Sequence, residues 1–161
     1  MNTRIFSLVL VTLVTTATVT ATAQDKAGHL AIVVNKASSL SELSSAELAK
    51  FFKAEKTKAP DGSKVLIVMQ EGGRPEREAA LQNIYKMSDG EYNKYFLQAT
   101  FTGAVASAPK ALGNGRAVLA FVAASPNALG YLKGDETDDT VKVLKIDGKV
   151  PGETGYALSS K

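Results

Sequence analysis

The sequence predicts a single α/β domain with a partly parallel sheet. Two short apolar runs, at residues 30–34 and 65–69, contain many β-branched side chains and have the length of buried strands. Between and after these runs, apolar residues recur at the spacing of amphipathic helices. Strands that alternate with helices in this way are typical of an α/β fold, and no linker divides the chain into further domains.

The first strand is predicted at residues 29–35, and a polar, serine-rich loop follows it. The helix after this loop begins with a capping box, in which Ser44 and Glu47 can each accept from a backbone N–H of the other. A Pro-Asp-Gly turn at residues 60–62 then leads into the second strand. The apolar stripe of this first helix consists of Leu48, Phe51 and Phe52.

The second strand is followed by a glycine turn and a helix, and the chain is organised around this arrangement. Gly72 and Gly73 allow close approach to the backbone, and Pro75 suits the first helical position, where its missing N–H costs nothing. Such a turn lies at the carboxyl end of a strand, where the N–H groups of the following helix suit an anion. Arg74 and Arg77 add positive charge. The alternative is a simple tight turn beside a solvated face of arginines.

The remaining elements repeat the alternation. A second capping box, formed by Ser88 and Glu91, predicts the start of another helix, and its aromatic residues are assigned to the core rather than to a stacking platform for ligands. Residues 99–109 are predicted to form a loop. A further helix begins at Asn114, and strands are predicted at 128–132 and 141–146.

The tail at residues 151–161 is predicted to be irregular and to lie on the surface. The core is predicted from the positions that stand on an apolar stripe or within an apolar run. These predicted core residues are Leu48, Phe51, Ile67, Leu81, Ile84, Phe96 and Phe121.

The composition argues against several classes of protein. A net charge of +3 over 161 residues is nearly neutral and shows no basic stripe, which argues against a nucleic-acid binder. Because the chain has no cysteine, it has no disulfide framework, no thiolate nucleophile and no cysteine-based metal site. His29 is the single histidine, and Glu71 has no recognisable partner in the sequence as a general base. We therefore expect a protein that is not an enzyme and has no cofactor or metal.

Residues 1–23 have the three parts of a secretory signal peptide. Arg4 provides the positive region, residues 5–19 form an apolar, threonine-rich core, and the Ala-Thr-Ala of 21–23 matches a cleavage site. An uncleaved anchor is the alternative, but the apolar core is short for a membrane span. Removing the first 23 of the 161 residues leaves one domain, residues 24–161, with a net charge of +2 and no further predicted membrane span. We expect this domain in the periplasm.

An ordered set of short motifs carries a resemblance to a known family. The motifs are a strand that ends at Asn35, Leu-Ser-Ser-Ala-Glu-Leu-Ala-Lys-Phe-Phe at 43–52, Pro-Asp-Gly at 60–62, Arg-Glu-Ala-Ala-Leu at 77–81, Ser-Pro-Asn-Ala-Leu-Gly-Tyr at 125–131 and Gly-Tyr-Ala-Leu-Ser at 155–159. In this order they resemble the small periplasmic binding-protein-like domain proteins related to phosphate ABC transporter substrate-binding proteins. The resemblance covers essentially the whole chain after the signal peptide.

The resemblance implies a single type II periplasmic-binding-protein-like domain, with a mixed, mostly parallel sheet flanked by helices. It also implies a solute-binding protein for a small oxyanion such as phosphate, with an ABC permease or another envelope protein as its partner. The chain departs from the full-length relatives at the turn, because Met69 stands near the place of their arginine and Gly72 to Pro75 replace a hydroxyl-bearing segment. It also has about half the length of a two-lobed binding protein.

We expect the oxyanion at the glycine turn, with hydrogen bonds from the loop after the first strand across the crevice. For the residues in that loop, the alternative is a strand end and a helix-approach loop. The alternative function is an envelope interaction or sensor module that kept the fold and lost ligand binding. The predicted ligand-binding residues are Gly72, Gly73, Arg74, Arg77, Asn35 and Ser39.

The signal peptide leads to a first testable prediction. Because alanine stands at both recognition positions, we expect cleavage after Ala23, so that the exported protein begins at Gln24. Mass spectrometry of the exported protein measures its N-terminus. An exported chain that keeps residues 1–23 would instead be a tethered module.

Overall fold

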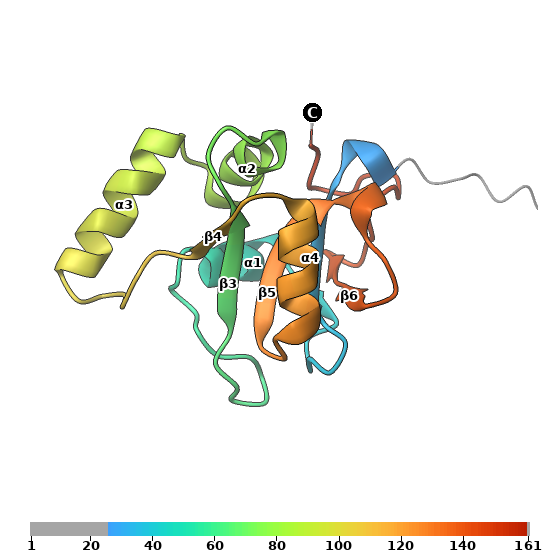
Figure 1. The fold of residues 1–161 in the computed structure, drawn as a ribbon, viewed down its shortest axis with the longest axis horizontal. Helices are drawn as coiled ribbons and strands as arrows, with labels where there is room; N and C mark the ends of the chain where they lie inside the picture. The colour runs from blue at the N-terminus through green and yellow to red at the C-terminus, as the bar shows by residue number, and fades with distance from the viewer. Residues whose placement is uncertain (1–25, 161) are drawn as a thin grey trace, which may run out of the picture.

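The computed structural model describes residues 26–160, and these form a central five-stranded sheet (Figure 1). The strand order is β4-β3-β5-β1-β6. β3 pairs in parallel with β4 and β5, whereas β1 pairs antiparallel with β5 and with β6. Only β1 therefore runs against the other four strands, which confirms a mixed, mostly parallel sheet. The strands are β1 (Leu30–Asn35), β3 (Leu66–Gln70), β4 (Lys110–Leu112), β5 (Ala128–Lys133) and β6 (Val141–Val143).

The predicted signal peptide and its cleavage site lie outside the described residues, so the cleavage stays a prediction. Across residues 26–160, no helix combines the length and the apolar content that crossing a membrane requires.

Helices cover both faces of the sheet. The larger group lies on one face, and α4 lies alone on the other (Figure 1). Strand alternation explains this division, because Ile32 and Met69 belong to the core cluster of the larger group, whereas Val33 and Val68 pack with α4. The helices are α1 (Ser45–Phe52), α2 (Pro75–Ala80) with its π-helical continuation η2 (Leu81–Tyr85), α3 (Asp89–Phe101) and α4 (Gly115–Ala124).

The caps predicted from the sequence begin the helices. The Ser44 hydroxyl accepts from the backbone N–H of Glu47 at the start of α1, while the Glu47 carboxylate lies 3.0 Å from the Lys56 ammonium. At α3 the capping box is complete, because the backbone N–H of Ser88 also donates to the Glu91 carboxylate over 2.8 Å. Each cap satisfies N–H groups that a helix start leaves without an intrahelical partner.

Two predicted segments differ from the structure. The predicted loop at 99–109 is shorter, because α3 continues to Phe101 and β4 begins at Lys110, a strand that the sequence interpretation missed. The predicted strand at 141–146 is divided. Its second part, β7 (Lys145–Ile146), leaves the main sheet and pairs in parallel with β2 (Glu42–Leu43).

The C-terminal tail is irregular, as predicted, but part of it packs into the core instead of lying on the surface, so that part of the prediction is wrong. Tyr156 and Leu158 are buried, the backbone N–H of Leu30 donates to the carbonyl of Leu158, and the Tyr156 hydroxyl donates to the carbonyl of Leu30. Six of the seven predicted core residues are buried. Phe121 is only half-buried, because it lies at the margin of the α4 cluster, with the Lys110 ammonium over its ring.

Helix α4 packs closely against the sheet at Gly130. A Cβ atom there would lie 2.6 Å from Cγ2 of Val68 and 2.9 Å from Cγ1 of Val118. We therefore expect Gly130→Ala to lower the free energy of unfolding by about 1–3 kcal/mol, because overpacking displaces α4 from the strand. Chemical denaturation of the variant measures this loss.

Gly90 provides the matched control, because it lies in the first turn of α3 and a Cβ atom there would meet no atom within 4 Å. We expect Gly90→Ala to be neutral or slightly stabilising, since alanine is the better helix former. Equal stability of the Gly130→Ala variant and the wild type would contradict the close packing of α4.

Candidate functional site

The glycine turn lies at the carboxyl edge of the sheet, directly after β3. Gly72 and Gly73 are exposed, and Gly73 has a φ of +79°, in the left-handed region that favours glycine. Arg74 is the N-cap residue of α2 and makes no side-chain cap, and Pro75 is the first helical residue. The turn therefore presents an open backbone and an exposed guanidinium at the start of a helix.

Arg77 is buried beneath this turn, with 8% of its surface exposed. Its Nε and Nη2 donate to Oδ1 of Asp89 over 3.1 and 2.9 Å, and its Nη1 donates to the carbonyl of Gln70 over 3.1 Å. The guanidinium also lies over the ring of Tyr92, 4.8 Å from its centroid. The expectation that Arg77 lies at the crevice edge is wrong, because these contacts hold it inside. It connects the end of β3 to the start of α3.

Gln70 is a polar residue of this edge that the sequence interpretation missed as a candidate. It is 1% exposed, and its backbone N–H donates to the Tyr131 hydroxyl. Its side-chain Nε2 is the one buried side-chain nitrogen or oxygen within residues 26–160 that has no hydrogen-bond partner. Buried donors of this kind usually pair with a protein group, an ordered water or a ligand. In the sequence, the position of this glutamine at the end of an otherwise apolar strand was the signal that could have identified Gln70 as a candidate.

Asn35 lies at the opposite edge of the sheet. Because β1 runs antiparallel to β5, its last residues lie beside the amino ends of β5 and β3, where Val34 pairs with Leu129 and Leu66 pairs with Ala128. The Asn35 amide donates to the carbonyls of Val122 and Ala123 over 3.0 and 2.7 Å and so closes the end of α4. The expectation that it faces the glycine turn across a crevice is therefore wrong.

Ser39 follows Asn35 in the same exposed loop. Its hydroxyl hydrogen-bonds to the Asp61 carboxylate. Together with the larger contribution of the Ser63 hydroxyl, this contact lowers the pKa of Asp61 to about 2. Ser39 thus connects its loop to the Pro-Asp-Gly turn, and the structure does not bring it to the glycine turn.

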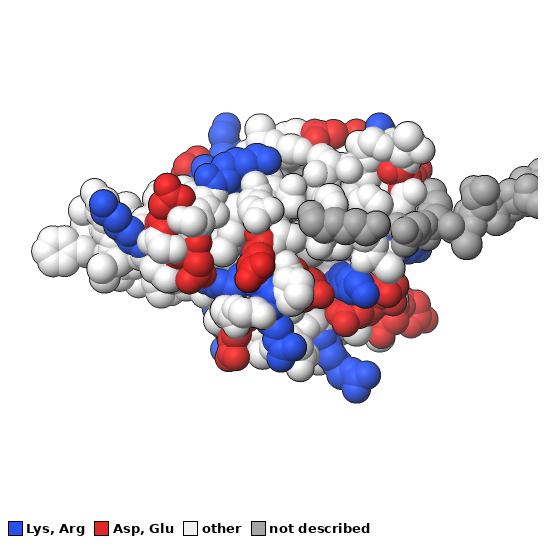
Figure 2. All heavy atoms as spheres, turned by 90° about the horizontal axis from the view of Figure 1, so that it is seen from above, with Lys and Arg blue, Asp and Glu red and all other residues white. Residues whose placement is uncertain are grey.

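The surface around the glycine turn carries both signs of charge. Figure 2 looks onto this side of the molecule and shows basic and acidic side chains interspersed. Glu76 and Glu78 lie in the first turn of α2, close to Arg74. Directed hydrogen bonds, rather than a broad positive field, would therefore have to hold an anion here. Within residues 26–160, no cluster of three or more histidine, aspartate or glutamate side chains could hold a metal ion.

No protein-family model and no curated protein matches this sequence. Solved structures do match its fold. A putative phosphate ABC transporter substrate-binding protein with bound phosphate from Clostridium perfringens is 17% identical with a TM-score of 0.66. An ABC-type phosphate transport receptor from Vibrio cholerae is 18% identical with a TM-score of 0.65, and PstS from Borrelia burgdorferi is 11% identical with a TM-score of 0.64.

Each match covers 81% of this chain but only 52–54% of the other protein, so the chain spans about half the length of these structures. At these identities the likeness is one of fold. The chain has a periplasmic-binding-protein-like fold that is related to phosphate ABC transporter substrate-binding proteins, as the ordered motifs predicted.

The buried position of Arg77 leads to a stability prediction. We expect Arg77→Ala to lower the free energy of unfolding by about 1.5–3 kcal/mol, the range for hydrogen bonds to a charged group, because the carbonyl of Gln70 loses its partner. Thermal or chemical denaturation measures this loss.

Arg74→Ala is the matched control for Arg77→Ala. Arg74 is exposed and caps nothing with its side chain, so its removal should change stability by no more than about 0.5 kcal/mol. Equal effects of the two substitutions would contradict a structural role for Arg77.

Proposed function

We propose that this chain is an exported, periplasmic solute-binding-like protein that holds a small oxyanion, such as phosphate, at the glycine turn. The proposal is carried by the fold likeness to phosphate-transport proteins, one of which is described with bound phosphate. Export rests on the signal-peptide pattern of residues 1–23. An ABC permease is the corresponding partner, and the role is one of binding rather than catalysis.

Within this proposal, the residues of the turn have different tasks. Gly72 and Gly73 let the anion approach the backbone, and Arg74 donates charge-assisted hydrogen bonds from its exposed guanidinium. Arg77 acts as a positioning residue, because it holds the carbonyl of Gln70 and so the end of β3 in place. Asn35 and Ser39 are not included, since they lie at the other edge of the sheet.

A second candidate function is an envelope interaction or sensor module that kept the fold and lost its ligand. The composition of the turn favours this alternative, because Pro75 has no N–H to donate and Glu76 and Glu78 repel an anion from the first turn of α2. Direct titration with anions distinguishes the two functions.

The test is calorimetric titration of the full chain with phosphate and with sulfate at low and high ionic strength. We expect Arg74→Ala to weaken binding about tenfold or more, at about 1.4 kcal/mol per decade, since a charge-assisted hydrogen bond is lost. The Arg77→Ala variant should lose less affinity, because Arg77 positions the turn and does not itself contact the anion. Added salt should weaken binding of the wild type, since Arg74 is exposed.

Lys36→Ala is the control, because it removes a cation that is also exposed but lies in the loop at the opposite edge of the sheet. Affinity should not change in this variant. If the Lys36→Ala and Arg74→Ala variants bind alike, the anion site is elsewhere. If the wild type shows neither heat nor a thermal shift at millimolar anion, the interaction module is the better explanation.

A further inference from the structure

The large apolar side chains that the described residues leave exposed come from two segments, β3 and α3. They are Leu66, Leu97 and Phe101, which are 45%, 73% and 92% exposed. Leu97 and Phe101 are four residues apart and therefore share one face of α3. The C-terminal half of α3 stands out from the rest of the molecule (Figure 1). Phenylalanine is usually buried, so an almost fully exposed ring on a projecting helix indicates a surface for a partner.

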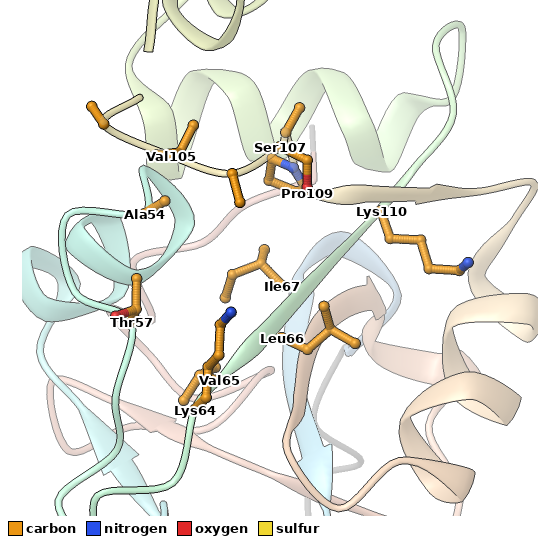
Figure 3. A pocket seen from close by; sticks show the side chains of 13 residues that line it. Ala54, Thr57, Lys64, Val65, Leu66, Ile67, Val105, Ser107, Pro109 and Lys110 are labelled. Atoms are coloured by element: carbon orange, nitrogen blue, oxygen red, sulfur yellow. The ribbon is translucent and has the colours of Figure 1, made fainter. Parts of the chain in front are cut away.

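An apolar groove lies beside this helix. The segment that returns from α3 to β4 forms one wall, and the first half of β3 forms the floor (Figure 3). β4 pairs with β3 only from Val68 onward, so Leu66 and Ile67 have no β4 partner on that side. The groove has a volume of about 510 Å³, within the range of binding pockets. Its apolar lining includes Ala54, Val65, Leu66, Ile67, Val105 and Pro109.

The charged groups of the groove are all basic. Lys64 and Lys110 line it, and no acidic residue does. The Lys64 ammonium extends toward the groove between Thr57 and Ile67, while Lys110 points toward α4 (Figure 3). There the Lys110 ammonium lies 5.5 Å from the centroid of the Phe121 ring. The groove therefore presents an apolar floor with positive charge at its margins.

The exposed end of α3 is complementary to such a groove. Residues 95–102 contain no charged side chain, and the last turn of α3 has no basic residue. The carbonyl groups at a helix C-terminus carry partial negative charge, which favours nearby cations. The C-terminal end of α3 thus carries both the aromatic ring of Phe101 and the partial negative charge of the helix dipole. It matches a groove that is apolar in the middle and basic at its margins.

We propose that a second copy of this chain docks here, with Phe101 of each copy in the groove of the other. Both complementary surfaces belong to one chain, and the segment after α3 connects them directly. A twofold dimer buries both surfaces at once. Helix α3 of the first copy lies in the groove of the second, and by symmetry α3 of the second copy lies in the groove of the first. This dimer is independent of the proposed anion site, since the groove lies at the amino end of β3 and the glycine turn at its carboxyl end.

The test is sedimentation velocity of the purified full chain over a wide range of protein concentration. We expect the wild type to form a dimer and Phe101→Glu to weaken the dimer at least about tenfold, as expected for a buried aromatic anchor. The melting temperature of the dissociated chain should not change, because Phe101 is 92% exposed. Ala108→Trp, which fills the groove from its exposed wall, should weaken the dimer as well. Thr154→Glu, at an exposed position of the C-terminal tail, should not.

A disulfide experiment tests the geometry directly, because the natural chain has no cysteine. Phe101→Cys and Ala106→Cys are prepared as separate proteins, mixed and oxidised in air. We expect a disulfide-linked dimer that contains one copy of each, since Ala106 lines the groove. Thr154→Cys replaces Ala106→Cys in the control mixture, which should yield little mixed dimer.

The second-copy proposal is overturned if the wild type remains a monomer at millimolar concentration. It is also overturned if the wild type dimerises but neither Phe101→Glu nor Ala108→Trp weakens the dimer. If the wild type remains a monomer and Phe101→Glu abolishes the binding of another envelope protein, the surface serves that partner instead.

Discussion

The reversed strand β1 is the constraint on which the arrangement of the molecule depends. Leu30 to Val34 are at most 1% exposed, so their side chains fill both core clusters of the sheet. β1 runs antiparallel between β5 and β6, and its first residue, Leu30, also holds the C-terminal tail through hydrogen bonds with Leu158 and Tyr156. Its direction places its end, at Asn35, on the edge opposite the glycine turn. The direction of β1 therefore keeps the loop after Asn35 away from the glycine turn, so the two loops cannot contribute to one site.

A second constraint acts at the carboxyl edge. The guanidinium of Arg77 makes its contacts inside the protein, with Asp89, the carbonyl of Gln70 and the ring of Tyr92. A buried guanidinium needs such partners, because an uncompensated buried charge is costly. Arg77 thus fixes the position of the turn from inside the protein. Arg74 is exposed, so it is the arginine of this turn that a ligand in solvent can reach. The same edge holds the buried Gln70 side chain, whose Nε2 has no hydrogen-bond partner.

The two ends of β3 therefore support different interactions. Its carboxyl end presents exposed backbone and the exposed guanidinium of Arg74, which suit a small polar ligand. Its amino end presents an apolar groove beside the exposed Phe101, which suits a protein surface. Ligands of open α/β sheets generally bind at the carboxyl edge, so the proposed association at the opposite edge would leave the proposed anion site open. Binding and association can thus be tested separately in this molecule.

The sequence by itself determined most of the local elements, because their causes are local, although it did not show β4 or the division between β6 and β7. Apolar runs predicted β1 and β3, and Ser44 and Ser88 marked helix starts through contacts three residues away. The ordered motifs also indicated the fold. Only the tertiary structure decided that β1 is reversed, that Arg77 is buried and that Asn35 closes α4. These outcomes depend on pairing and hydrogen bonds between residues far apart in the chain, and no local pattern encodes such contacts.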